Sequence, residues 1–188
     1  MTRIVAGSAK GRMLAVPKSG TRPTSERVRE ALFSRLSHYD YIEKCNILDL
    51  FSGSGALAFE AISRGASNAT CVESNAKAAK IISDNGRKLK LSVKVINQKV
   101  ETYLESLTDE MRYDLVFIDP PYDFSELKIA DILANLKPYL RKNAMVVVER
   151  AKKAPEPIWP DFLILEDERK WGDTRVWSAV LINHTENI

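Results

Sequence analysis

Histidine and cysteine are scarce in this chain of 188 residues, which has two of each. Cys45 and Cys71 lie in or beside apolar segments and lack C-x-x-C spacing, so a disulfide framework or a zinc site is not expected. His38 and His184 are too isolated for a histidine metal site or a catalytic triad. We therefore expect no metal and interpret both cysteines as small core residues.

Long apolar runs are also absent. No window approaches the roughly 18 to 20 apolar residues of a membrane span, and the N-terminus lacks the apolar stretch of a secretory signal. We expect a cytoplasmic protein without a membrane partner. With 45% hydrophobic residues, the chain can bury one sizeable core. It should form one domain with a small appendage, and we expect a monomer.

Positive charge is concentrated near the N-terminus. The net charge is only +3, but residues 1–37 carry eight basic and two acidic side chains, which leaves the remainder mildly acidic. A basic arm on an acidic body indicates a polyanionic partner held by one end of the molecule. The alternative is a solvated basic surface without a partner.

Apolar runs and stretches of helical length alternate through the middle of the chain. The runs show no apolar/polar alternation, which is typical of strands buried on both faces. Strands are expected at Ile47 to Phe51, Ala69 to Val72, Val93 to Ile96, Leu115 to Ile118 and Met145 to Val148. Helices are expected at Leu57 to Arg64, Ala76 to Leu89, Val100 to Leu107 and Leu127 to Leu136. This order predicts an α/β fold with a doubly wound, mostly parallel sheet.

The two ends depart from this order. Arg3 to Pro17 is interpreted as a hairpin, and a helix follows with Thr24 or Ser25 as N-cap. One face of this helix is apolar, and its arginines are expected elsewhere. Phe162 to Leu165 and Arg175 to Ile182 are expected to close the sheet as an antiparallel pair, giving seven strands. We divide the chain into a basic extension, residues 1–40, and a catalytic domain, residues 41–188.

A glycine-rich loop follows the first strand of the sheet. Ser52-Gly53-Ser54-Gly55 leads into a helix near Ala56. Glycine can adopt positive φ and lets a ligand lie against bare backbone at a helix N-terminus. In a doubly wound sheet this turn binds a nucleotide-like cofactor. Glu73 ends the next strand, where its carboxylate could accept hydrogen bonds from two ribose hydroxyls. A glycine turn without a ligand is the alternative.

Two cofactor classes fit this loop. Gly53, Gly55 and Ala58 match the dinucleotide pattern G-x-G-x-x-G/A. Asp49, in the strand just before the loop, suits a cofactor amino group better than a pyrophosphate. A methyl donor without phosphate tolerates that acid.

The motif Asp119-Pro120-Pro121-Tyr122 directly follows the apolar run Leu115 to Ile118. Asp119 is therefore expected at a C-terminal strand end, where open α/β sheets bind ligands, and the prolines predict a fixed, extended loop. A carboxylate and a backbone carbonyl there could orient an exocyclic base amine toward a methyl sulfonium, and Asp119 would stabilise the developing positive charge. Tyr122 offers a ring on which an extruded base can stack. A rigid turn without chemistry is the alternative.

Nearly the whole chain resembles the RsmD family of 16S ribosomal RNA guanine methyltransferases, which modify the exocyclic amine at guanine position 2. The resemblance is carried by Arg3-Ile4-Val5-Ala6-Gly7, Gly11-Arg12, Arg22-Pro23-Thr24, Arg27-Val28-Arg29-Glu30, Leu32-Phe33, the segment Asp49 to Gly55, and Asp119 to Tyr122. The arm and R-P-T motifs are specific to this family and its close relatives. The glycine loop and D-P-P-Y occur in many amino-methyltransferases.

The resemblance implies S-adenosylmethionine as cofactor and catalysis by Asp119, Pro120, Pro121 and Tyr122. The cofactor-binding residues that it implies are Asp49, Phe51, Gly53, Gly55, Glu73, Ser74, Gln98, Val100 and Asp119. The RNA-binding residues that it implies are Arg3, Lys10, Arg12, Arg22, Arg27, Arg169 and Lys170. The segment Arg169 to Thr174 resembles the family's loop near the target base, with a solvated hairpin turn as the alternative.

One position departs from the family pattern. Lys99 stands where such enzymes usually place Asp or Asn to bond the adenine amine of the cofactor. Asn97, Gln98 or the backbone of Val100 is left to make that contact.

We therefore interpret the chain as an enzyme that transfers a methyl group from S-adenosylmethionine to a guanine amine in 16S ribosomal RNA, free or within a small ribosomal subunit. A second hypothesis keeps the chemistry but places it on adenine or cytosine in DNA. Such an enzyme would usually need a larger recognition region than this short arm. A third is a non-catalytic RNA-binding assembly factor, against which the intact Asp119 and glycine loop argue.

Overall fold

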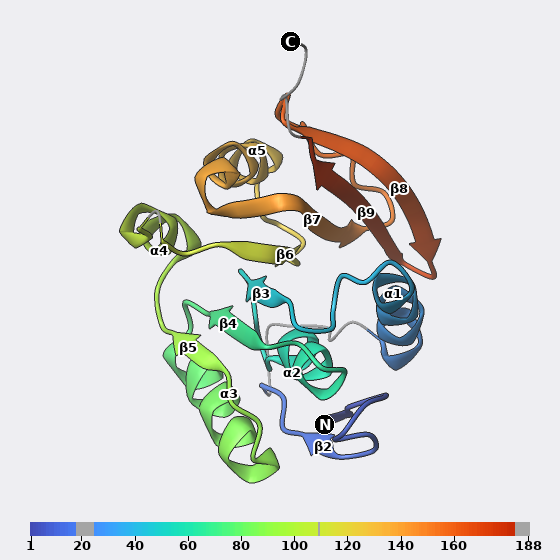
Figure 1. Ribbon diagram of the computed structural model, residues 1–188, viewed down its shortest axis with the longest axis vertical. Coiled ribbons are helices and arrows are strands. Elements are labelled where there is room, and N and C mark those ends of the chain that lie inside the picture. The colour runs from blue at the N-terminus through green and yellow to red at the C-terminus, as the bar shows by residue number, and fades with distance from the viewer. Residues whose placement is uncertain (18–24, 109, 183–188) are drawn as a thin grey trace.

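The computed structural model describes residues 1–17, 25–108 and 110–182 (Figure 1). The strands are β1 (Thr2–Arg3), β2 (Met13–Leu14), β3 (Asn46–Asp49), β4 (Asn68–Val72), β5 (Lys94–Ile96), β6 (Tyr113–Ile118), β7 (Leu140–Ala151), β8 (Leu163–Trp171) and β9 (Thr174–Leu181). The helices are α1 (Glu26–His38), α2 (Ala56–Ser63), α3 (Ala76–Leu89), α4 (Val100–Ser106), α5 (Glu126–Asn135) and a 3₁₀ turn (Lys137–Tyr139).

The main sheet has the strand order β5-β4-β3-β6-β7-β9-β8, and β3 to β7 pair in parallel. β9 runs antiparallel to β7, and β8 antiparallel to β9. The doubly wound α/β fold with seven strands and a small N-terminal hairpin is therefore confirmed. β7 runs past Val148 and β8 runs past Leu165, because backbone pairing with β9 continues there through polar residues. β7 also begins earlier than predicted, at Leu140, which pairs with Tyr113 of β6.

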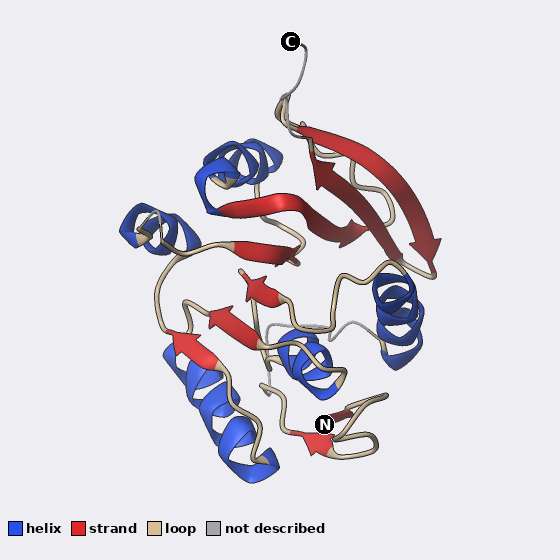
Figure 2. Cartoon of the chain, in the orientation of Figure 1, coloured by secondary structure: helices blue, strands red, loops and turns tan. Residues whose placement is uncertain are grey.

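Helices cover both faces of the sheet, as Figure 2 shows. The core on one face combines side chains of α1, α2 and α3, for example Phe33, Phe59 and Ile82, with Phe117 of β6. The core on the other face combines side chains of α4 and α5 with Ile118 and Val148. Side chains of a strand point alternately to its two faces. Asp49, at the end of β3, and Asp119, directly after β6, therefore fall on the face of α2 and α3.

The N-terminal extension packs onto the face of α2. Ile4 and Leu14 of the hairpin belong to the same buried core as Phe33 and Phe59. Our division of the chain at residue 40 stays a prediction. In the structure, residues on both sides of this division contribute to the same core. Cys71 lies in the core as expected, and Cys45 is partly buried beside it.

The α1 helix begins where the sequence predicts. Ser25 is its N-cap, and its Oγ accepts a hydrogen bond from the Val28 N–H at 3.3 Å. One expectation is wrong: Arg29 does not lie on an exposed face but is fully buried. Its partner Glu60, also fully buried, lies 3.5 Å away, so the arginine is buried as part of an ion pair.

Candidate active site

The glycine loop joins β3 to α2. Gly53 and Gly55 have φ of +53° and +78°, so both positions need the left-handed backbone that glycine adopts without penalty. The loop is held by the Ser52 hydroxyl, which donates to the Asp49 carbonyl at 2.8 Å, and by the Gly55 N–H, which donates to the Ser52 carbonyl at 2.6 Å.

Gly55 faces the protein core. A β-carbon at this position would come within 2.9 Å of the Phe59 ring and 3.1 Å of Ile82. The missing side chain therefore allows close packing of the loop on α2 and α3. Gly55 does not line the cleft described below, whereas Gly53 does.

Glu73 follows β4 and is hydrogen-bonded to the glycine loop. Its Oε2 accepts from the Gly53 N–H at 2.8 Å, and its Oε1 accepts from the Asn75 N–H at 2.8 Å. Asn75 in turn caps α3. The carboxylate is thus fixed between two loops, where its remaining lone pairs can accept from hydroxyl groups of a ligand.

Asn97 holds the backbone of the loop that follows β4. Its amide donates to the carbonyls of Glu73 and Ser74 at 2.8 and 3.1 Å, and Asn97 does not line the cleft. The next three residues, Gln98, Lys99 and Val100, do line it. Of the alternatives left open for the adenine contact, Gln98 and Val100 are therefore the ones within the cleft.

Asp49 is almost completely buried beneath the loop, at 1% exposure. Neither carboxylate oxygen has a hydrogen-bond partner among the described residues. Burial, together with the negative charges of Asp119 and Glu73, raises the pKa of Asp49 from 3.8 to about 8. The Phe51 N–H and the Ser52 side chain lower that pKa, each by less than any of the three causes that raise it. A buried acid without a partner can accept a cationic group of a ligand.

The Asp-Pro-Pro-Tyr loop leaves β6 beside the glycine loop. Pro120 is buried, whereas Tyr122 is 58% exposed and free to stack on a flat ligand. Phe124 contacts Phe51 edge to face, with ring centroids 5.1 Å apart. The ammonium of Lys128 lies 5.7 Å from the centre of the Phe124 ring. Aromatic contacts thus join the two loops.

One cleft of about 1100 Å³ brings these segments together. The predicted residues that line it are Asp49, Phe51, Gly53, Glu73, Ser74, Gln98, Val100, Asp119, Pro120, Pro121 and Tyr122. It also includes residues that the sequence did not single out, namely Asn75, Lys77, Glu101, Phe124, Lys128 and Glu149. Glu149 could have been predicted from the sequence, because it directly follows the apolar run in β7 as Asp119 follows the one in β6.

The hairpin is attached to this cleft. Val16 and Pro17, at its end, line the cavity. The buried Asn85 of α3 bonds the backbone of Ala15 through both amide atoms, each at 2.9 Å, and donates to the Ser54 carbonyl at 3.2 Å. One side chain thus holds the hairpin and the glycine loop together.

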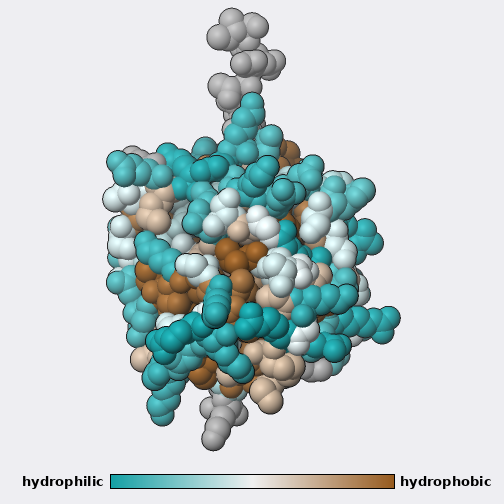
Figure 3. Space-filling view, turned by 60° about the horizontal axis from the view of Figure 1, so that its bottom comes forward, coloured by the Kyte–Doolittle hydropathy of each residue, from teal (hydrophilic) through white to brown (hydrophobic). Residues whose placement is uncertain are grey.

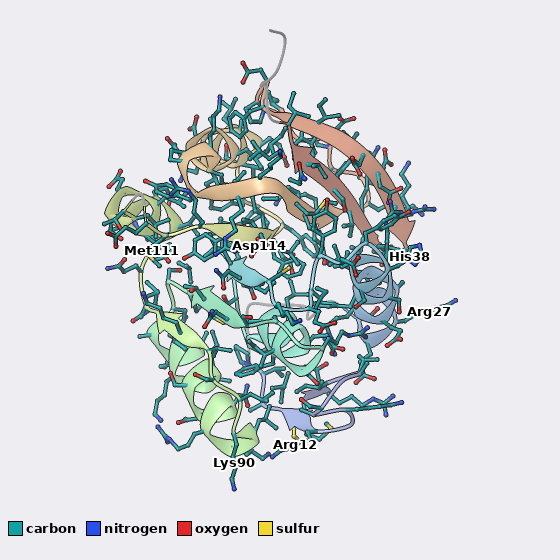
Figure 4. All side chains as sticks on the ribbon, in the orientation of Figure 1. Arg12, Arg27, His38, Lys90, Met111 and Asp114 are labelled. Carbon is teal, nitrogen blue, oxygen red and sulfur yellow. The ribbon has the colours of Figure 1, made fainter. Side chains whose placement is uncertain are left out.

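The basic residues of the arm differ in their contacts. Arg12 donates to the Leu89 and Lys88 carbonyls at 2.7 and 3.0 Å, at the end of α3, and Arg3 pairs with Glu26 at 2.7 Å. Lys10 is exposed, and Figure 4 shows Arg27 pointing away from the protein. Arg22 lies outside the described residues. The face that carries the hairpin and α3 is mostly hydrophilic, with hydrophobic residues gathered at its centre (Figure 3).

A second pair of predicted RNA-binding residues lies in the β8–β9 hairpin. Arg169 pairs with Asp167 at 3.1 Å, and Lys170 with Glu168 at 3.2 Å. The turn reaches the same edge of the sheet as the Asp-Pro-Pro-Tyr loop, because Thr174 pairs with Ala151 at the end of β7. Over half of each basic side chain stays exposed there.

Among the described residues, no group of three or more histidine, cysteine, aspartate or glutamate side chains could hold a metal ion. In the same part of the chain, no helix is long and apolar enough to cross a membrane.

Similar proteins are known for almost the whole chain. The family model described as "Conserved hypothetical protein 95" matches residues 2–180. Ribosomal RNA small subunit methyltransferase D of Haemophilus influenzae is 40% identical over 90% of this chain and 89% of its own. The protein of the same name from Escherichia coli K12 is 34% identical over 90% and 85%. The solved structure of Escherichia coli YhhF superposes with a TM-score of 0.85 at 29% identity, covering 97% of this chain and 99% of its own. The chain belongs to the conserved hypothetical protein 95 family, and it is a methyltransferase.

Proposed function

We propose that this protein transfers a methyl group from S-adenosylmethionine to the exocyclic amine of a guanine in small-subunit ribosomal RNA. The single observation that carries the proposal is the cleft itself. It places the glycine loop with Glu73 and the Asp-Pro-Pro-Tyr loop around one cavity. The relatives named above supply the substrate class, since they are named as methyltransferases of small-subunit ribosomal RNA.

The residues on the β3–β5 side of the cleft suit S-adenosylmethionine. When bound, this cofactor supplies a methyl group already activated on a sulfonium. Glu73 would accept from the ribose hydroxyls, Gln98 and Val100 would border the adenine, and the unpartnered Asp49 would face the cationic part. The Gly53 N–H is occupied by Glu73, which disfavours the dinucleotide alternative, because a pyrophosphate would need such backbone donors.

The residues on the β6–β7 side suit a flat base. Asp119 and the Pro120 carbonyl would accept the two N–H groups of the exocyclic amine and direct its lone pair toward the cofactor side. Asp119 would stabilise the positive charge that develops on nitrogen. Tyr122 would stack on the base, and positioning would supply most of the rate enhancement.

RNA would reach the cleft between two basic groups, the exposed residues of the arm and the pair Arg169 and Lys170. The RNA would be part of an assembling or assembled small subunit, which would place the protein in the cytoplasm. The protein would act as a monomer. The DNA alternative lacks a specific observation in its favour.

The proposal is tested by incubating the purified protein with S-adenosylmethionine labelled in the methyl group. The substrates are naked 16S RNA, small subunits prepared without the modification, and duplex DNA. We expect label in N2-methylguanosine of one of the two RNA substrates. Label in adenine or cytosine of DNA would replace the proposal with the DNA alternative. Cofactor binding without transfer to any substrate would favour the assembly factor.

A further inference from the structure

Arg150 lies beneath the Asp-Pro-Pro-Tyr loop, near the end of β7. Its side chain is only 3% exposed, and its strand runs between β6 and β9. It does not line the cleft, so it is placed to act on the loop and not on a ligand.

The guanidinium of Arg150 contacts three points of the loop and the helix behind it. Nη1 donates to the Pro121 carbonyl at 3.0 Å, and Nη2 donates to the Phe124 carbonyl at 2.8 Å. Nη2 also pairs with the carboxylate of Glu126, in the first turn of α5, at 2.5 Å. One buried side chain therefore holds both ends of the turn from Pro121 to Phe124.

Two prolines limit the hydrogen bonds that the backbone of this loop can donate. Pro120 and Pro121 have no backbone N–H to donate. The Phe124 N–H donates to the Pro121 carbonyl at 2.9 Å, which closes the turn. Arg150 donates to the same Pro121 carbonyl and also to the Phe124 carbonyl. The ring of Phe124 contacts Phe51 beside the glycine loop.

We propose that Arg150, held by Glu126, is a positioning residue that fixes the Asp-Pro-Pro-Tyr loop relative to the cofactor loop and so sets the geometry of methyl transfer. The inference rests on the proposed function, because it assumes that this loop holds the base. Arginine suits the role because its planar fork can serve two carbonyls and a carboxylate together, which a lysine ammonium reaches less well.

The test compares Arg150→Lys, Arg150→Met and Glu126→Gln with a matched control, Arg141→Met. Arg141 lies on the same strand, is half-exposed and pairs with Asp114 at 3.7 Å, away from the loop. We expect Arg150→Met to lower kcat about 10- to 100-fold at saturating substrates, because small misplacements of reacting groups can cost that much. Arg150→Lys and Glu126→Gln should give intermediate losses, and the control should keep wild-type kcat.

Two readouts separate positioning from general destabilisation. Cofactor affinity, measured by calorimetry, should stay within about twofold of wild type, because Glu73 and the glycine loop do not contact Arg150. Amide exchange of Phe124, followed by NMR without RNA, should accelerate in the Arg150 variants but not in Arg141→Met. If Arg150→Met does not fold, Arg150→Lys and Glu126→Gln decide the matter.

The inference is overturned if these two milder variants keep wild-type kcat and Phe124 exchange, or if cofactor affinity falls in parallel with kcat. A wild-type protein inactive on every RNA would instead refute the proposed function, while the exchange measurement would still report on the loop.

Discussion

The carboxylate of Glu73 accepts a hydrogen bond from the Gly53 N–H at 2.8 Å, which ties the end of β4 to the cofactor loop after β3. Its other oxygen accepts from the Asn75 N–H. Glu73 therefore holds the loops after β3 and β4 together, and it is also the acceptor that we assign to the ribose hydroxyls.

Glu73→Gln should weaken S-adenosylmethionine binding by roughly 10-fold or more, since a hydrogen bond to a charged group contributes about 1.5–3 kcal/mol. The amide nitrogen would also face a backbone N–H and repel it. Calorimetry measures the affinity, and Glu105→Gln, an exposed position on α4, serves as control. Equal affinity of Glu73→Gln and wild type would remove Glu73 from the cofactor site.

Asp49 should make the stability of the ligand-free protein pH-dependent. Its pKa is about 8 in the folded state against a usual 3.8, so between these values the folded state holds a proton that the unfolded state releases. Stability from this group is fully present below pH ~4 and is lost as pH rises toward 8, on the order of 1 kcal/mol per pH unit. Asp49→Asn should flatten this slope in denaturant titrations at pH 5, 6.5 and 8. An unchanged slope would show that Asp49 is already charged at neutral pH.

The same group should couple protons to cofactor binding. A cationic ligand favours the charged form of Asp49, so binding below pH ~8 should release a proton and grow stronger as pH rises. Calorimetry in two buffers of different ionisation enthalpy measures the release. We expect it to be reduced in Asp49→Asn. Proton release of the same size in that variant would assign the coupling to another acid, with Asp119 as the next candidate.

Asp119→Ala should separate chemistry from binding. If Asp119 acts on the transition state, turnover should fall roughly 10²- to 10³-fold, the scale of losing one preorganised electrostatic partner, while cofactor affinity changes little. Single-turnover methylation and calorimetry on the same preparation measure the two quantities. Wild-type turnover in this variant would exclude Asp119 from the mechanism.

Local patterns made much of the fold and part of the candidate site predictable. The helix Ala76–Leu89 has the predicted bounds, because its capping residue Asn75 and its periodicity are local signals. Asp49 ends a strand and Gly53, Glu73 and Asp119 follow strands, and the edge of a parallel sheet brings such residues together.

Other features depend on contacts between distant segments and leave no local signal. In the sequence, Arg29 looks like a surface residue. In the structure, Glu60, which is 31 positions later, lies 3.5 Å from it in the core. Arg150 has a role only because β7 passes beneath a loop that begins 31 positions earlier, at Asp119. The family resemblance and the charge of the arm assign Arg12 to RNA binding, and only the packing of the hairpin shows that it bonds the end of α3.

The arm prediction follows from this difference between Arg12 and Lys10. Each lost phosphate contact should flatten the slope of log affinity against log salt by about 0.7 to 0.9. Lys10→Ala and Arg27→Ala should therefore weaken RNA binding and reduce that slope without changing stability, because both side chains are exposed. Arg12→Ala should instead lower the unfolding free energy by about 0.5–1.5 kcal/mol, since its guanidinium, although exposed, bonds two helix-end carbonyls.

Filter binding at three salt concentrations and denaturant unfolding of the same variants distinguish the two roles. A solvated arm without an RNA partner predicts wild-type slopes for Lys10→Ala and Arg27→Ala. In that case Arg169→Ala and Lys170→Ala become the informative variants, because this pair lies at the same sheet edge as Asp119 and stays over half exposed. A reduced slope in those variants alone would move the RNA contact from the arm to the β8–β9 turn.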